Sequence, residues 1–231
     1  DYISMENVPE LVKESIFDEF VTKLKGLGYA VDYSVVKAEE YGVPQHRRRL
    51  LLLASKEGTI SLIDPTNDEK HAVTVREAIG NLPAVKAGGV CEGDPLQTAS
   101  MLSKINMQRI QASVPNGTWR DWPEELRLDC HKKDSGQTYP SVYGRMAWDE
   151  TSPTITTQFY MYGTGRFGHP EQDRALTLRE GAILQSFPKG YEFILPGEKL
   201  SRKAIARHIG NAVPPKLGEA VGRSIIAACT T

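Results

Sequence analysis

The sequence has 231 residues, of which 40% are hydrophobic and 25% are charged, so it can bury the core of one large or two small globular domains. Its formal net charge of −1 at pH 7 excludes a general attraction to phosphate, so any nucleic-acid interface has to be local. No run of about 18 apolar residues and no charged-then-apolar leader occurs, which predicts neither a membrane span nor secretion.

The first 65 residues have the pattern of an α/β sheet. Residues 1–8 are predicted to form a strand that is closed by Pro9. In residues 10–27 apolar side chains recur every three or four positions, which predicts an amphipathic helix. Residues 29–38 and 49–55 are predicted strands, and the second contains four consecutive leucines, as is typical of a strand buried on both faces. We expect half of a parallel sheet.

After residue 65 the pattern becomes irregular. Thr74 and Glu77 form a predicted capping box before a short helix, and residues 84–173 are rich in Gly, Pro, Ser and Thr, with short strands expected at 141–145 and 152–160. Helices are predicted again from a second capping box at Thr177 and Glu180, at 201–208 and at 215–228. The expected organisation is an α/β part at 1–65, a loop-rich domain at 66–200 and closing helices at 201–231 that return to the first part.

Three cysteines occur in the chain and form no CxxC pair, which argues against a disulfide framework or a metal site. Cys91, Cys130 and Cys229 are each expected to be a small buried residue. This cysteine content is typical of a reducing, intracellular environment.

Five short segments occur in an order that is specific in combination: Glu6-Asn7-Val8; Gln45-His46-Arg47-Arg48-Arg49; Pro153-Thr154-Ile155; Arg179-Glu180 with Gln185-Ser186-Phe187-Pro188; and Gly210-Asn211-Ala212-Val213-Pro214-Pro215. Together they resemble the second half of the DNA cytosine-5 methyltransferase family, from its ENV motif through its QxRxR motif to its GNxVPP motif. The resemblance covers essentially the whole chain.

This resemblance implies a fold and a reaction. The fold is α/β, a partial S-adenosylmethionine-dependent methyltransferase sheet with an inserted small, irregular target-recognition domain. The reaction is methyl transfer from S-adenosylmethionine to C5 of a cytosine flipped out of double-stranded DNA, since that carbon is inaccessible within the stack. The resemblance also implies a cytoplasmic, bacterial or phage-encoded protein associated with DNA, as in a restriction-modification system.

The family places a Pro-Cys nucleophile and a glycine-rich cofactor loop upstream of its ENV motif, and neither occurs in this chain. The chain also begins at Asp1 without Met. We therefore expect a C-terminal portion with an incomplete S-adenosylmethionine pocket. It would be inactive alone and completed by an N-terminal part that carries the cysteine.

Glu6 is the first candidate catalytic residue. The resemblance places its carboxyl group at N3 of the cytosine, where it can stabilise the charge that develops and supply a proton. The alternative is a structural carboxylate at the start of the following helix, where a negative charge is favourable.

The basic segment at 45–49 supplies the next candidates. These residues precede a buried strand, so a guanidinium is expected near the end of the sheet, where ligands of open α/β sheets bind. The resemblance implies that Arg49 contacts cytosine O2, that Arg47 contacts phosphate or has a structural role, and that Gln45 faces DNA. The alternative is a solvated charge run.

The remaining candidates lie in the second half of the chain. By resemblance Asn211, Ala212 and Val213 contact the cofactor, whereas turn chemistry alone also explains Asn before Pro. Thr154, Ile155 and Thr156 are the candidate DNA contacts, with strand packing as their alternative.

Two other functions stay open. The chain could be a catalytically inactive DNA-binding module, or a scaffold that binds a partner enzyme. The first would use a cluster of basic residues: Arg202, Lys203, Arg207, Lys216 and Arg223.

Overall fold

A computed structural model describes residues 1–67, 71–195 and 197–230, and the chain divides into two compact units. Unit 1 comprises Asp1–Ala72 and Val213–Thr231, and unit 2 comprises Val73–Ala212. The divisions expected from the sequence were at 65/66 and 200/201. Each unit is described by itself below.

The sheet of unit 1 has the strand order β1-β3-β2. β1 is Tyr2–Asn7, β2 is Ala30–Lys37 and β3 is Arg48–Ser55. β3 lies between the other two strands and is antiparallel to both, so β1 and β2 run parallel to each other without pairing. The α/β class is confirmed, but the expectation of an all-parallel arrangement is wrong. The short connection from β2 to β3 leaves no room for the crossover that a parallel neighbour requires.

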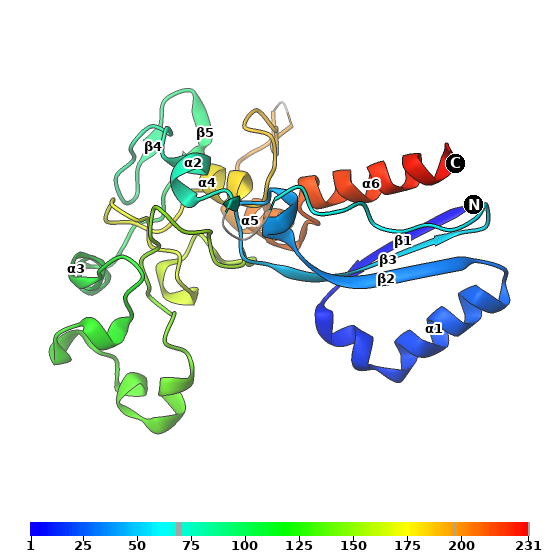
Figure 1. Ribbon diagram of the computed structural model, residues 1–231. Helices are drawn as coiled ribbons and strands as arrows, with labels where there is room; N and C mark the ends of the chain where they lie inside the picture. The colour runs from blue at the N-terminus through cyan, green and yellow to red at the C-terminus, as the bar shows by residue number, and fades with distance from the viewer. Residues whose placement is uncertain (68–70, 196, 231) are drawn as a thin grey trace. The chain divides into compact units, whose positions relative to one another are not determined.

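Helices cover both faces of this sheet, as Figure 1 shows for α1 (Ser15–Gly26) and α6 (Pro215–Cys229). The first face packs Phe17, Val21 and Leu24 of α1 against Leu50 and Leu52. The opposite face packs α6 against the sheet through residues that include Leu51, Leu217 and Ala220. Because successive side chains of a strand point to opposite faces, the leucine run of β3 supplies both cores. The prediction of a strand buried on both faces is confirmed.

The helix expected over residues 10–27 is divided in two. A 3-10 helix, η1 (Pro9–Lys13), comes first, and Glu14 is then extended, with φ −90° and ψ 136°, before α1 begins. A second 3-10 helix, η2 (Ala38–Tyr41), follows β2 and ends at Gly42, whose φ of 76° favours glycine.

Unit 2 contains short elements joined by long irregular segments. Its α-helices are α2 (Val75–Ile79), α3 (Lys104–Ala112), α4 (Leu178–Leu184) and α5 (Arg202–Asn211). β4 (Val90–Cys91) and β5 (Asp94–Thr98) form an antiparallel pair. Its 3-10 helices are η4 (Trp119–Asp121), η5 (Glu124–Leu126), η6 (Asp129–Lys132), η7 (Asp134–Thr138) and η8 (Tyr162–Thr164). The capping boxes predicted at Thr74 and Thr177 are both present.

The short strands expected at 141–145 and 152–160 do not form. Arg145 makes only isolated bridges, with Pro115 and Gly168, and Tyr143 has a φ of 59°, outside the strand region. The guanidinium of Arg145 donates instead to the carbonyl oxygens of Ile110, His169 and Gln172. Strand propensity reflects packing on a pleated surface, and no neighbouring strand supplies that surface here.

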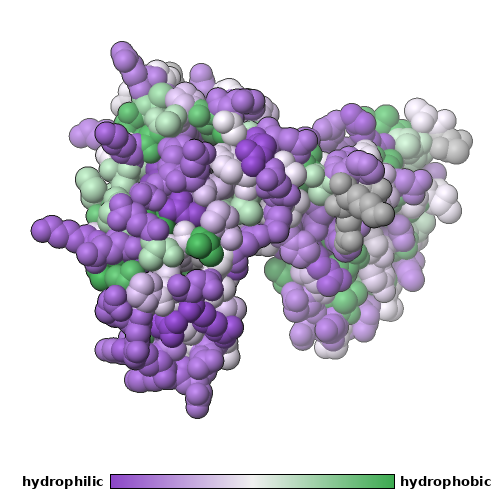
Figure 2. Space-filling view, turned by 60° about the vertical axis from the view of Figure 1, so that its left-hand side comes forward, coloured by the Kyte–Doolittle hydropathy of each residue, from purple (hydrophilic) through white to green (hydrophobic). Residues whose placement is uncertain are grey.

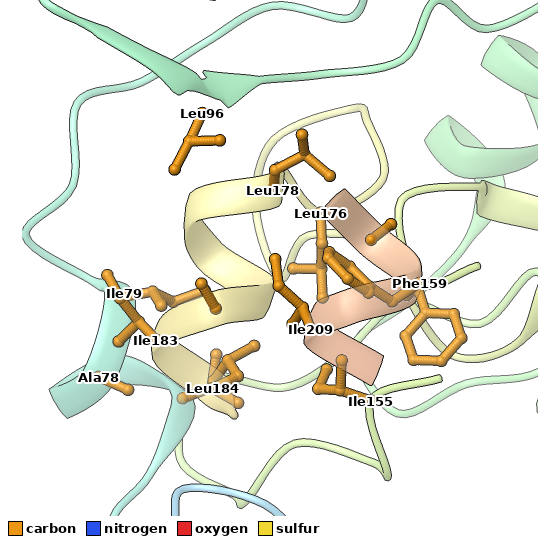
Figure 3. Packing of buried hydrophobic residues seen from close by; sticks show 14 of the residues in the cluster. Ala78, Ile79, Leu96, Ile155, Phe159, Leu176, Leu178, Ile183, Leu184 and Ile209 are labelled. Carbon is orange, nitrogen blue, oxygen red and sulfur yellow. The ribbon is translucent and has the colours of Figure 1, made fainter. Parts of the chain in front are cut away.

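The main core of unit 2 gathers α2, α4, α5 and the irregular segment between α3 and α4. Figure 3 shows Leu178 and Leu184 of α4, Ile209 of α5, and Ile155 and Phe159 among its members. A second cluster in unit 2 is rich in aromatic residues. Trp119 stacks on His131 with ring centroids 4.2 Å apart, and Trp122 and Tyr162 belong to the same cluster.

The expectation that the cysteines are buried is wrong. Cys130 and Cys229 are exposed and Cys91 is partly exposed. Cys130 lies in a 3-10 turn and Cys229 is the last residue of α6, so neither faces a core.

Among the described helices none is both long enough and apolar enough to cross a membrane. Hydrophilic side chains dominate the face drawn in Figure 2, and its apolar patches are small and separate.

Candidate active site

Glu6 lies near the end of β1, beside β3. Its Oε1 is 2.8 Å from Arg49 Nε, and the two side chains are 21% and 16% exposed. The pair is therefore partly shielded from water but still accessible to a ligand. The N-cap residue of η1, Val8, makes no side-chain cap bond, and its N–H donates to Asn7 Oδ1 at 2.8 Å. The partner of the Glu6 carboxylate is Arg49.

Arg49 keeps hydrogen-bonding capacity after this pairing. A guanidinium carries five N–H donors. Nε faces Glu6, and Nη1 donates to the carbonyl oxygen of Arg48 at 2.7 Å. The other N–H groups can donate to a planar acceptor such as the edge of a base.

Side chains of the 45–49 segment alternate between buried and exposed positions. Gln45 and Arg47 are buried, whereas His46 and Arg48 are exposed. Arg47 Nη1 donates weakly to Gln45 Oε1 at 3.5 Å, and the carbonyl oxygen of Arg47 accepts from the Ala38 N–H at 2.8 Å. The side chains of Gln45 and Arg47 therefore lie on the protein side of the segment.

Burial lowers the pKa of Arg47 to about 10, with a further lowering from Arg49 and an opposing effect of Glu6. The guanidinium still carries its charge at neutral pH. Two positive charges and one negative charge thus lie together at this end of the sheet, which favours an electron-rich ligand group.

Glu39, in η2, holds the 45–49 segment in place, and sequence reasoning did not identify it. Its side chain is buried, its Oε2 accepts from the Arg47 N–H at 3.2 Å, and its Oε1 is 2.7 Å from His46 Nδ1. The only local signal is a charged residue within the Ala38–Tyr41 turn, which does not reveal its partners.

In unit 2 residues 153–156 lie outside the named helices and strands. Ile155 is completely buried in the main core, whereas Thr156 is exposed and Thr154 is partly exposed. The isoleucine anchors the segment, and the threonine on each side of it lies nearer to solvent.

Asn211 ends α5 and is exposed, and Ala212 is its C-cap residue. Val213 is 41% exposed and is the first residue of the second part of unit 1. An exposed amide can both donate and accept hydrogen bonds, so Asn211 suits a polar ligand group.

A buried ion pair organises the region around α4. Arg174 donates two hydrogen bonds to Glu180, at 2.8 Å and 2.7 Å, and both side chains are inaccessible to solvent. Burial by itself would raise the pKa of Glu180, but the bonds from Arg174 hold it below its ordinary value. Sequence analysis identified Glu180 as a capping residue and missed this partner.

The basic cluster expected from the sequence is distributed over both units. Arg202, Lys203 and Arg207 belong to unit 2, and Lys216 and Arg223 to unit 1. Arg202 donates to Thr98 at 2.8 Å, and Arg223 pairs with Glu219 at 2.5 Å, so these two side chains have partners within the protein. In the described part of the chain no group of three or more His, Cys, Asp or Glu side chains could hold a metal ion.

Comparison with known proteins gives one consistent family. Residues 1–227 match the family described as C-5 cytosine-specific DNA methylase. The chain is 54% identical over 228 residues to the type II methylase M.HgiDII of Herpetosiphon aurantiacus, in a match that covers 97% of this chain and 64% of that protein. It is 37% identical over 223 residues to the type II methyltransferase M1.BsuMI of Bacillus subtilis (strain 168), covering 93% of this chain and 48% of that protein. The chain thus spans less than two thirds of both relatives.

Solved structures agree on the fold. A protein described as a DNA modification methyltransferase encoded within a prophage (E. coli) matches with a TM-score of 0.70 and 21% identity, covering 100% of this chain and 70% of that one. A DNMT2 variant of Spodoptera frugiperda matches with a TM-score of 0.61 and 18% identity, covering 98% of this chain and 66% of that one.

Proposed function

Because this chain belongs to the family of C-5 cytosine-specific DNA methylases, we propose that it is the C-terminal portion of a DNA cytosine-5 methyltransferase. When completed by a part that carries the cysteine nucleophile, it acts on a cytosine in double-stranded DNA. The target carbon is inaccessible within the stack, so the base is flipped out before reaction. Unit 1 holds the flipped base, and unit 2 recognises the DNA around it.

The observation that carries this proposal is the Glu6–Arg49 pair at the end of the sheet. Attack of a thiolate at C6 increases electron density at N3 of the base. A carboxyl group held at N3 stabilises that density and donates a proton, and a guanidinium N–H stabilises the negative charge at O2. Arg49 has donors left for this task beyond its ion pair with Glu6 and its hydrogen bond to Arg48.

The cofactor of this reaction is S-adenosylmethionine, which supplies an electrophilic methyl group when bound. The exposed amide of Asn211, the partly exposed Ala212 and Val213 suit one wall of its site. In this proposal they bind and orient the cofactor from one side, and the completing part provides the rest of the pocket. The amide of Asn211 can donate to and accept from polar groups of the cofactor.

The DNA contacts of unit 2 are proposed at Thr154 and Thr156, with Ile155 as their anchor. Short hydroxyl side chains allow a backbone to approach DNA closely and can bond to phosphate or base edges. Gln45 and Arg47, which are buried, support the base-binding end of unit 1. The type II relatives from bacteria support a cytoplasmic role in a restriction-modification system.

Reconstitution tests the proposal. This chain, the Pro-Cys-containing part encoded by the same genome, and their mixture are each incubated with duplex DNA and S-adenosylmethionine labelled in its methyl group. We expect labelled 5-methylcytosine only from the mixture. Label transferred by this chain alone contradicts the division of labour, and no transfer by a mixture that binds both DNA and cofactor contradicts the activity.

A further inference from the structure

The last turn of α5 packs directly on the backbone of residues 156–157. A Cβ atom placed on Gly210 would lie 2.5 Å from the carbonyl carbon of Thr156 and 2.6 Å from both Thr156 O and Thr157 N. Real Cβ atoms essentially never come within 3.0 Å of such neighbours. The close approach of α5 to residues 156–157 therefore requires glycine at position 210, and the two backbones are in direct contact.

A second contact fixes the residues that follow Gly210. Gln185 is completely buried and donates from Nε2 to the carbonyl oxygen of Ala212 at 2.7 Å. Ala212 is the C-cap residue of α5, where helix carbonyl groups otherwise lack partners. The bond thus ties the end of α5 to the end of α4.

The end of α4 is itself rigid. The Ser186 N–H donates to Ile183 O at 2.8 Å and the Phe187 N–H to Ala182 O at 2.9 Å, which is the Schellman arrangement of a helix C-terminus. Ser186 has a φ of 69°, in the left-handed region that this arrangement requires. This turn restrains the backbone of Gln185, whose side-chain amide donates to Ala212.

The end of α5 and the 154–157 segment, which meet at Gly210, contribute residues to the same hydrophobic core. Ile155 and Ile209 are each completely buried in the same cluster, and Figure 3 shows Ile209 between α4 and α5 with Ile155 near it. Close-packed interiors transmit small displacements, because there is little free volume to absorb them. A displacement of residues 210–212 is therefore transmitted to residues 154–157.

From these contacts we propose that Gln185 and Gly210 are positioning residues that couple cofactor binding at residues 211–212 to DNA binding at residues 154–157. This inference rests on the proposed function, which assigns the cofactor to residues 211–212 and DNA to residues 154–156. A bound cofactor adds contacts at residues 211–212, and the Gly210 contact with Thr156 and Thr157 carries this added restraint to the recognition segment. By thermodynamic linkage, DNA binding tightens cofactor binding by the same factor.

The experiment measures this factor in the complete, reconstituted enzyme. The affinity for target duplex is determined with and without saturating S-adenosylhomocysteine, the demethylated cofactor product, so that no turnover occurs. We expect coupling of about 5- to 150-fold in the wild type. It should fall to about onefold in Gln185→Met, which keeps the volume but removes the donor, while each affinity measured alone changes by less than about threefold.

A matched control comes from the same core. Ile79→Val removes a methylene group from a buried residue of this cluster without touching either contact. It should retain wild-type coupling even when its melting temperature falls as far as that of Gln185→Met. Gly210→Ala inserts a Cβ into the backbone contact and, where it folds, should behave like Gln185→Met.

The outcomes separate the two proposals. Wild-type coupling in a folded Gln185→Met enzyme overturns the inference, as does a wild-type enzyme that binds both ligands without any coupling. Failure of the wild-type mixture to bind target DNA or the cofactor product contradicts the proposed function itself. Equal loss of coupling in Ile79→Val also overturns the inference, because general loosening of the core would then account for the effect.

Discussion

Glu6 on β1 and Arg49 on β3 form an ion pair across neighbouring strands, with Oε1 and Nε 2.8 Å apart. In the strand register Glu6 is opposite Leu51. Arg49 lies two residues before Leu51 on β3, so its side chain contacts the carboxylate diagonally across the two strands. The carboxylate of Glu6 and the planar guanidinium of Arg49 are thus held side by side.

Replacement of the carboxylate tests its role in proton donation. In the complete enzyme, Glu6→Gln keeps the shape of the side chain but cannot supply a carboxyl proton, so single-turnover methylation should fall on the order of a hundredfold or more. Affinity for duplex DNA should change little, because phosphate contacts dominate it. Glu10→Gln, on the exposed part of η1, is the control. Near-normal turnover in Glu6→Gln would exclude the catalytic assignment.

The donor fork is tested by Arg49→Lys, which keeps the positive charge and removes the planar set of N–H groups. We expect turnover to fall by roughly a hundredfold, the usual effect of removing a preorganised donor to a developing negative charge. Arg48→Lys, in the exposed neighbouring position, should retain activity within about threefold. Equal activities of the two variants would show that charge alone suffices.

Glu39 should matter for both stability and activity, although it does not reach the site. Glu39→Gln loses one of two acceptor oxygens that bind the Arg47 N–H and the His46 ring, in a buried environment. We expect loss of about 1–3 kcal/mol in the free energy of unfolding, measured by urea denaturation. Glu40→Gln, which removes a partly exposed ion pair with Lys37, should change it by less than about 1 kcal/mol. Similar values for both variants would contradict the assigned role of Glu39.

The buried Arg174–Glu180 pair predicts a large asymmetry between single and double substitutions. Arg174→Met leaves the carboxylate of Glu180 buried without its main partner, and we expect it to destabilise unit 2 by about 3–5 kcal/mol. Adding Glu180→Gln should recover part of that loss, since the unpaired charge is then gone. Thermal unfolding of the three proteins measures both steps. Additive destabilisation in the double variant would argue against a charge effect.

The pH dependence of stability should contain a signature of His169. Burial lowers the pKa of His169 to about 4, opposed by Glu180 and reinforced by Arg174 and Arg145. An unfolded histidine takes up its proton near pH 6.5, so below that pH the unfolded state binds more protons and stability falls as the pH decreases towards 4. When the pH falls from 7 to 5, this histidine should lower the free energy of unfolding by about 2 kcal/mol.

The matched variant is His169→Gln. The quantity compared with the wild type is the slope of the free energy of unfolding against pH, not the absolute stability. Part of the slope should remain, because burial, Arg109 and Arg127 also lower the pKa of His131. The lowered pKa of Glu180 acts in the same direction, but below the ordinary range of a glutamate, so it contributes little above pH 5. An unchanged slope between pH 7 and pH 5 in His169→Gln would contradict the prediction.

Most local elements of the fold were predictable from the residue pattern. The spacing of apolar residues predicted α1 and α6, the leucine run predicted a strand buried on both faces, and the capping boxes at Thr74 and Thr177 were correct. Such features depend on neighbours within one or two turns of chain, so their causes are visible in the sequence. Ordered motifs also identified Glu6, Arg49 and Asn211 as candidates, though not their geometry.

The contacts that these candidate residues make depend on how distant parts of the chain pack. The sequence did not place Arg49 against Glu6, Glu39 beneath the 45–49 segment, or Gly210 on the backbone of Thr156. It also predicted strands at 141–145 and 152–160 that do not form, and the backbone of Arg145 makes only isolated bridges. These interactions join residues far apart in the chain, and packing of the whole unit, not local propensity, selects among the partners that each side chain could take.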